Sequence, residues 1–169
     1  ITGKFLDIDI QGRNGLKLSE AWKEGPKTYL GLQTPGFPNM FSITGPGSPS
    51  VLCNMPVPIE QHVEWITECI AHMRQNGIDT CEASQEAADE WVTHVNEVAN
   101  ATLLVTVPHS WYLGANIEGK PRVFMPYAGG MARYRVLCDD VVKNNYAGFM
   151  MLSKNNSASV QKNNPRHNF

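Results

Sequence analysis

The chain has 169 residues, of which 42% are hydrophobic and 18% are charged, so it is long enough to bury one core. Its net charge of -2 gives no reason to expect a nucleic-acid partner, and no apolar run approaches the roughly 20 residues that cross a bilayer. The four cysteines form no Cys-x-x-Cys pair, which predicts free thiols in a reducing, cytoplasmic setting.

The first 55 residues carry signals for short elements that are joined by turns. The alternation over 5–10 predicts a half-buried strand, and Ser19 is placed to cap a short helix over 20–24. The apolar run 40–44 predicts a second strand, and a Gly/Pro/Ser loop follows over 45–55. A strand, a loop and then a helix is the order in which α/β proteins present a ligand.

The helix after this loop has the clearest periodicity in the chain. Its apolar residues recur at spacings of four and three, which predicts one apolar stripe made by Ile59, Val63, Ile66, Ile70 and Met73. Pro56 and Pro58 fit only in its first turn, and Asn76-Gly77 predicts its end. We expect the first turn to offer unpaired backbone N–H groups to a ligand.

Two further helices and two strands are predicted. Ser84 is placed to cap the second helix, and Gly129-Gly130 opens the third. The inward faces are expected to carry Ala87, Trp91, Val95 and Val98 in the second helix and Tyr134, Leu137 and Val141 in the third. Residues 103–107 are predicted to form a strand or a buried extended segment, and 146–152 a last strand. Residues 153–169 have almost no apolar side chains, so we expect a disordered tail.

The chain contains no glycine-rich phosphate-binding loop. Gly45 and Gly47 are not followed by a third glycine at the required spacing, and Gly-x-Gly-x-x-Gly occurs nowhere. On spacing alone, the loop over 45–55 is more simply interpreted as a tight turn without a ligand, because glycine and proline mark turns in most folds. The histidines and cysteines have no metal-ligand spacing, so no metal site is predicted.

Long and irregular motifs recur along most of the chain. They lie at 28–32, 35–39, 45–50, 54–55, 59–65, 90–91, 94–97, 110–112, 114–116, 119–125 and 133–135. Together these motifs resemble the C-terminal part of the flavin-dependent Baeyer–Villiger monooxygenases, most closely those of the phenylacetone and steroid monooxygenase type. The resemblance covers roughly residues 1–152, and the length of the motifs makes chance agreement improbable.

The resemblance implies an α/β fold and an enzyme of which this chain is a fragment. Residues 1–152 would form the C-terminal segment of a two-segment, Rossmann-like FAD-binding domain with few strands and about three amphipathic helices. The enzyme would use FAD and NADPH to insert one atom of O2 into a ketone, giving an ester or lactone. The missing N-terminal part of the same chain would be its partner. The alternatives are a related flavin monooxygenase that oxidises nitrogen or sulfur, and a non-catalytic remnant or binding module.

The resemblance also assigns roles to five residues. Met55 is expected to contact FAD, chiefly through its backbone, and Trp111 is expected to contact NADP. Ser50, Val51 and Leu52 are expected to line the ketone pocket. The helix N-terminus is expected to face the pyrimidine edge of the flavin ring, where the helix dipole stabilises negative charge. No catalytic side chain is assigned.

Overall fold

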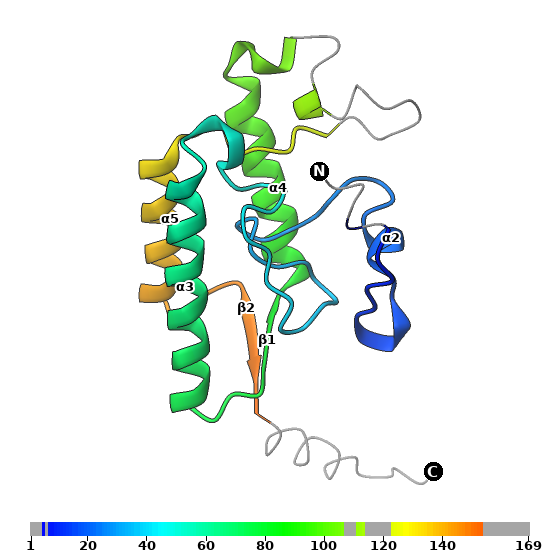
Figure 1. The fold of residues 1–169 in the computed structure, drawn as a ribbon, viewed down its shortest axis with the longest axis vertical. Coiled ribbons are helices and arrows are strands. Elements are labelled where there is room, and N and C mark those ends of the chain that lie inside the picture. The colour runs from blue at the N-terminus through cyan, green and yellow to red at the C-terminus, as the bar shows by residue number, and fades with distance from the viewer. Residues whose placement is uncertain (1–4, 6, 107–110, 114–122, 154–169) are drawn as a thin grey trace, which may run out of the picture.

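Figure 1 shows the computed structural model of the chain, which describes residues 5, 7–106, 111–113 and 123–153. Its helices are α2 (Leu18–Ala21), α3 (Pro56–Gln75), α4 (Gln85–Asn100) and α5 (Met131–Lys143). Its antiparallel sheet pairs β1 (Thr80–Ala83) with β2 (Phe149–Leu152). Short 3-10 turns are η1 (Arg13–Gly15), η2 (Ser50–Leu52), η3 (Leu103–Thr106) and η4 (Trp111–Leu113). The fold is α/β, as predicted.

The main core lies between the three long helices and the sheet. In Figure 1, α3 and α5 lie side by side, and β1 leads from α3 toward α4. Trp65 of α3, Trp91 of α4 and Tyr134 of α5 are all buried in this core. The indole N–H of Trp65 donates to the carbonyl of Cys138 on α5 at 3.3 Å. Large aromatic side chains therefore hold the helices against one another.

The predicted limits of the long helices are confirmed. The Ser84 hydroxyl accepts a hydrogen bond from the backbone N–H of Ala87 at 3.1 Å, so Ser84 caps α4. Asn76 ends α3, and Gly77 follows it with a φ of 63°. Gly130, with a φ of 84°, precedes α5. The predicted inward residues of α4 and α5 are buried or half-buried in the structure.

The predicted apolar stripe on α3 is not the face that α3 buries. Ile59, Val63 and Ile70 are 38%, 45% and 38% exposed, and of the five predicted residues only Met73 is buried. The buried residues are Pro58, Gln61, His62, Trp65, Cys69 and Met73. The periodicity counted only apolar residues, whereas His62 enters the core because both of its ring nitrogens have hydrogen-bond partners there. Gln61 is also buried, although its Oε1 has no partner among the described residues.

Three predictions of short elements are wrong. Residues 7–10 form no strand; their backbone contacts are local, and the nearest pairing is the isolated bridge of Gln11 with Lys17. Segment 40–44 forms one bridge, between Phe41 and Gln33, instead of a strand. The region predicted as a strand or a buried extended segment at 103–107 contains η3 instead. A strand requires a partner along its edge, and the periodicity of a segment does not supply one.

Further corrections concern the ends of two short elements. The first helix begins at Leu18, after Lys17, so Ser19 lies inside it and does not cap it. The last strand starts at Phe149, because Asn145 and Tyr146 have positive φ and end the preceding helix in a turn. β1 was not predicted. The expected tail lies outside the described residues, except for Ser153, and the division into 1–152 and 153–169 stays a prediction.

Candidate functional site

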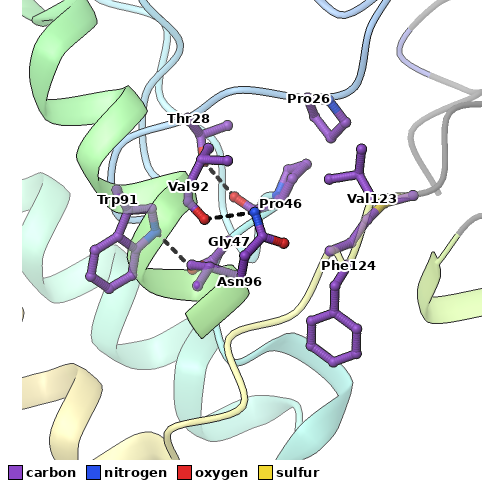
Figure 2. Close-up of a pocket in the computed structure, with 11 residues that line it drawn as sticks. Pro26, Thr28, Pro46, Gly47, Trp91, Val92, Asn96, Val123 and Phe124 are labelled. Carbon is purple, nitrogen blue, oxygen red and sulfur yellow. Dashed lines mark hydrogen bonds between the residues drawn. The ribbon is translucent and has the colours of Figure 1, made fainter. Parts of the chain in front are cut away.

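The loop that leads to α3 is held in place from several sides. Figure 2 shows two of these contacts: the indole N–H of Trp91 donates to the carbonyl of Gly47 at 3.0 Å, and the Thr28 hydroxyl donates to the carbonyl of Pro46 at 2.5 Å. Within the loop, the Ser48 hydroxyl donates to the carbonyl of Gly45 at 2.8 Å. The cavity between these groups measures only about 10 Å³, which leaves room for at most one water molecule. The surroundings of Gly47 are therefore a packed anchor and not a ligand pocket.

A second backbone segment, 123–127, ties this loop to η4. The N–H of Gly47 donates to the carbonyl of Met125 at 2.6 Å, and the N–H of Tyr127 donates to the carbonyl of Ser48 at 2.7 Å. The N–H of Met125 in turn donates to the carbonyl of Tyr112 at 3.0 Å. Met125 thus joins the segment that carries Trp111 to the loop that leads to Met55, through two hydrogen bonds of its own backbone.

Both ends of the loop have unusual backbone conformations. Thr44 has a φ of 53° and Ser50 a φ of 43°, in the left-handed region that residues with a β-carbon rarely adopt. Gly47, with a φ of 85°, has no such restriction, but a β-carbon there would lie 2.9 Å from Trp91 Nε1. Strained residues of this kind persist only where surrounding contacts hold them, and they are concentrated at functional sites.

His62 holds the Thr44 end of the loop. The N–H of Thr44 donates to His62 Nδ1 at 2.8 Å, and His62 Nε2 lies 2.8 Å from the Tyr134 hydroxyl. That hydroxyl donates to the carbonyl of Leu30 at 2.5 Å, so the imidazole donates to it from Nε2. Burial lowers the pKa of His62 to about 4, which keeps the ring neutral in this arrangement. One neutral histidine therefore connects α3, α5 and two loops.

The start of α3 offers fewer donors than the sequence analysis expected. Pro56 and Pro58 have no N–H, and the N–H groups of Val57 and Ile59 donate to the carbonyls of Asn54 and Met55. The expectation that the first turn itself carries free N–H groups is wrong for these reasons. The free donors lie one step earlier: the backbone N–H groups of Asn54 and Met55 have no partner among the described residues.

The positive end of the α3 dipole is not compensated by the helix itself. The helix is 20 residues long, and its first turn contains no acidic side chain, while His72 and Arg74 lie in its last turn. The partial positive charge at the N-terminus therefore stays available to an anionic or electron-rich group near Met55. Free N–H groups beside an uncompensated dipole fit the electron-accepting edge of a flavin ring, which becomes negative on reduction.

The structure brings four of the five predicted site residues into one continuous stretch. Ser50 and Leu52 are half-buried in η2, Val51 lies between them, and Met55 is half-buried at the N-cap of α3. The Cys53 thiol donates to the carbonyl of Ser50 at 3.2 Å, and burial raises its pKa, so Cys53 is not an activated nucleophile. The fifth residue, Trp111, begins η4. The side chains of Val51 and Trp111 lie outside the described residues.

The sequence analysis did not identify the residues that position the site. Trp91 was expected as a core residue of the second helix and as part of a motif, and Thr28 and Met125 only as parts of motifs. No pattern in the chain could reveal their contacts with the loop, because Trp91 lies 44 positions from its acceptor Gly47.

The acidic, histidine and cysteine side chains of the described residues form no cluster of three that could bind a metal. Among the same residues, no helix is long and apolar enough to cross a membrane.

Comparison with known proteins shows which enzymes the chain is similar to. The chain is 39% identical over 151 residues to the acetone monooxygenase (methyl acetate-forming) of Gordonia sp. (strain TY-5), which covers 89% of the chain and 28% of that protein. It is 38% identical over 150 residues to a Baeyer–Villiger monooxygenase of Pseudooceanicola batsensis, covering 89% and 27%. The chain is homologous to one part of the Baeyer–Villiger monooxygenases. No protein-family model matches it.

The fold agrees with this homology to the Baeyer–Villiger monooxygenases. The crystal structure of cyclohexanone monooxygenase from Rhodococcus sp. Phi1 bound to NADP⁺ superimposes with a TM-score of 0.86 at 39% identity. That match covers 90% of the chain and 28% of the Rhodococcus protein. The chain thus spans little more than a quarter of the length of the relatives it matches.

Proposed function

We propose that the chain is one part of an FAD- and NADPH-dependent monooxygenase that inserts one oxygen atom of O2 into a ketone, giving an ester or lactone. The observation that carries the proposal is the start of α3. The backbone N–H groups of Asn54 and Met55 have no partner among the described residues, and they lie at the uncompensated positive end of a 20-residue helix. The similarity to the acetone and cyclohexanone monooxygenases supports this choice of reaction.

Each predicted residue has a defined part in this proposal. The Met55 N–H binds the pyrimidine edge of FAD, and Ser50, Val51 and Leu52 line the ketone pocket beside it. Trp111 binds NADP, and the Met125 backbone holds the segment that carries Trp111 against the loop that leads to Met55. Bound FAD supplies the redox and oxygen chemistry, while the chain orients the ring.

The rest of the enzyme comes from the part of the polypeptide that precedes these residues. That part supplies the phosphate-binding loops, because the chain has none of its own. The four cysteines, Cys53, Cys69, Cys81 and Cys138, are all free thiols, which supports a reducing, cytoplasmic location for the enzyme.

The test is a chimera in which residues 1–152 replace the matching segment of the Gordonia acetone monooxygenase. Bound flavin is measured by absorbance after desalting, and methyl acetate by gas chromatography. Met55→Pro removes the N–H of Met55 and suits the φ of -52° at this position, while Met55→Leu keeps that N–H. We expect Met55→Pro to lower flavin occupancy or turnover at least tenfold and Met55→Leu to change them less than threefold.

Two outcomes would contradict the proposal. Equal effects of Met55→Pro and Met55→Leu would mean that the backbone N–H does not bind the flavin. A chimera that oxidises amines or sulfides but yields no ester from any ketone would indicate the related heteroatom oxygenases.

The isolated 169 residues should retain no FAD, because flavin affinity in such folds depends on a pyrophosphate-binding helix start that this chain lacks. A stoichiometric yellow protein would overturn that expectation.

A further inference from the structure

A groove between α4 and α5 lies apart from the loop that leads to Met55. It measures about 390 Å³, which is within the size range of small-molecule sites in proteins. α4 lines it with Ala87, Glu90, Trp91 and His94, whose spacing places them on one face of the helix. Trp91 and Ala87 are 6% and 9% exposed and form the floor, while Glu90 is exposed at the rim.

The rest of the groove is apolar and is held in shape by contacts within the chain. Leu137 and Val141 line it from α5, one turn apart. Tyr29 also lines it, and its hydroxyl donates to the carbonyl of Ala147 at 3.1 Å. Gly148 brings the backbone close to this ring, since a β-carbon there would lie 2.7 Å from Tyr29. The groove is therefore formed before any ligand binds, as most small-molecule sites are.

The charge in the groove is negative. Among the described residues that line it, Glu90 carries the only carboxylate, and there is no lysine or arginine. Glu90 forms no hydrogen bond or ion pair with a described residue, whereas the neighbouring Asp89 is paired with Lys27 at 2.7 Å. Burial raises the pKa of the Tyr29 hydroxyl to about 12, and the charge of Glu90 contributes to this shift, so that charge acts across the groove.

We propose that this groove binds an organic ammonium ion with an apolar body, such as an alkyl- or arylammonium. The apolar walls bury the body, and the unpaired carboxylate of Glu90 attracts the ammonium group. An anion of the same shape would be repelled by Glu90, and a neutral molecule would gain nothing from it. The ligand is therefore neither the ketone nor the ester of the proposed reaction, because both of those are uncharged.

Trp91 connects the groove to the candidate cofactor loop. Its ring lies in the floor of the groove, while its indole N–H donates to the carbonyl of Gly47 at 3.0 Å. A ligand in the groove thus touches a residue that also holds the loop over 45–55. The same N–H reports whether the groove is occupied, since its NMR signal responds to changes around the ring.

The test is a titration of the 169-residue chain with three ligands that share one phenyl ring: benzyltrimethylammonium, benzyl alcohol and phenylacetate. Two-dimensional NMR at pH 8 follows the indole N–H of Trp91, so that histidine protonation does not compete with the ligand. The indole N–H of Trp65, which does not line the groove and donates to the carbonyl of Cys138, is the internal reference. We expect benzyltrimethylammonium to bind saturably and at least tenfold more tightly than phenylacetate, with benzyl alcohol between them.

Substitutions at Glu90 test the source of this preference. Glu90→Gln should weaken the binding of benzyltrimethylammonium at least threefold and Glu90→Lys at least tenfold, since the attraction of an exposed carboxylate is real but screened by water. Glu20→Gln makes the same change of charge on the exposed surface of α2 and should weaken binding less than twofold. Because Glu90 is exposed and unpaired, its variants should leave the unfolding temperature unchanged.

Four outcomes would overturn the proposal. The first is the absence of a saturable shift of the Trp91 signal, and the second is equal affinity for the three ligands. The third is equal weakening by Glu90→Gln and Glu20→Gln, which would indicate a general effect of surface charge. The fourth is a chimera with the Gordonia enzyme that no longer binds benzyltrimethylammonium in equilibrium dialysis, which would make the remainder of the polypeptide the occupant. A chimera that binds it but oxidises no ketone would support the groove and contradict the proposed function.

Discussion

The residues before Met55 and those after it are stabilised in different ways. In residues 7–54, the loop half, turns and isolated bridges hold the backbone, and five residues other than glycine have positive φ: Asn14, Leu30, Asn39, Thr44 and Ser50. In residues 56–153, the helical half, three long helices satisfy their own backbone groups and interlock through aromatic side chains. The loop half therefore depends on individual contacts, and the helical half depends on periodic packing.

The contacts that determine the loop half come largely from the helical half. His62 of α3 binds Thr44, Trp91 of α4 binds Gly47, and Glu82 of β1 accepts from Arg13 at 2.6 Å and from the N–H of Gly36 at 2.8 Å. The loop half is thus held by three distant anchors, of which His62 and Trp91 act on the segment that leads to Met55 and Glu82 acts on Arg13 and Gly36. Removing one anchor should disturb the loop half more than a similar change elsewhere disturbs the helical half.

The largest effect is expected from Gly47→Ala. The substitution forces a β-carbon into left-handed backbone and against Trp91 Nε1 and Thr28 Oγ1, at 2.9 and 3.2 Å. We expect it to lower the free energy of unfolding by about 3 kcal/mol, from backbone strain and two weakened hydrogen bonds. Gly77→Ala is the control, because Gly77 also has a positive φ but nothing lies near its β-carbon, so it should cost only about 1 kcal/mol. Urea unfolding measures both, and equal losses would contradict the prediction.

The next effect is a pH dependence that His62 imposes. Its pKa is about 4 in the folded chain and near 6.5 when unfolded, so between these values the unfolded state binds more protons. Stability should be complete above pH 6.5 and should fall by about 2 kcal/mol on going from pH 7.5 to 5. His62→Asn should be less stable at pH 7.5 but should lose this part of the pH dependence. An unchanged slope in His62→Asn would show that another group is responsible.

A smaller effect is expected from Trp91→Phe. The phenyl ring can still stack on Tyr127, whose ring centre lies 5.3 Å from that of Trp91, but the bond to Gly47 is lost. Trp22→Phe is a matched change in the loop half, since Trp22 is also buried and its Nε1 has no partner among the described residues. Trp91→Phe should cost about 1 kcal/mol more than Trp22→Phe, the usual net value of one hydrogen bond. Thermal unfolding compares them, and the reverse order would count against the anchor at Gly47.

The smallest effect concerns the ion pair that joins β1 to the loop half. Arg13→Met leaves the buried Glu82 carboxylate with only the N–H of Gly36, and should cost about 1 kcal/mol because Arg13 itself is 46% exposed. Lys143→Met removes an exposed pair with Asp140 and should cost less than about 0.5 kcal/mol. Chemical denaturation in low and high salt measures both. Equal losses would mean that the Arg13 anchor contributes no more than a surface pair.

The sequence by itself determined the limits of the long helices and the inward faces of α4 and α5. Ser84, Gly77 and Gly130 lie at the predicted helix ends, because capping and left-handed glycine are local properties of a few residues. The family resemblance also came from the sequence alone, because it depends on motifs of neighbouring residues. The comparisons confirm it. The positions of Met55 and Trp111 against a cofactor stay predictions.

Only the tertiary structure decided the loop half and the buried face of α3. Segment 40–44 has the pattern of a strand but meets a single bridge partner, and the apolar stripe through Val63 faces outward while His62 is buried. The anchors of the loop half join residues 18 to 69 positions apart. Periodicity reports which side chains avoid water, whereas strand pairing and the burial of a polar group depend on which partners the rest of the fold brings within hydrogen-bonding distance.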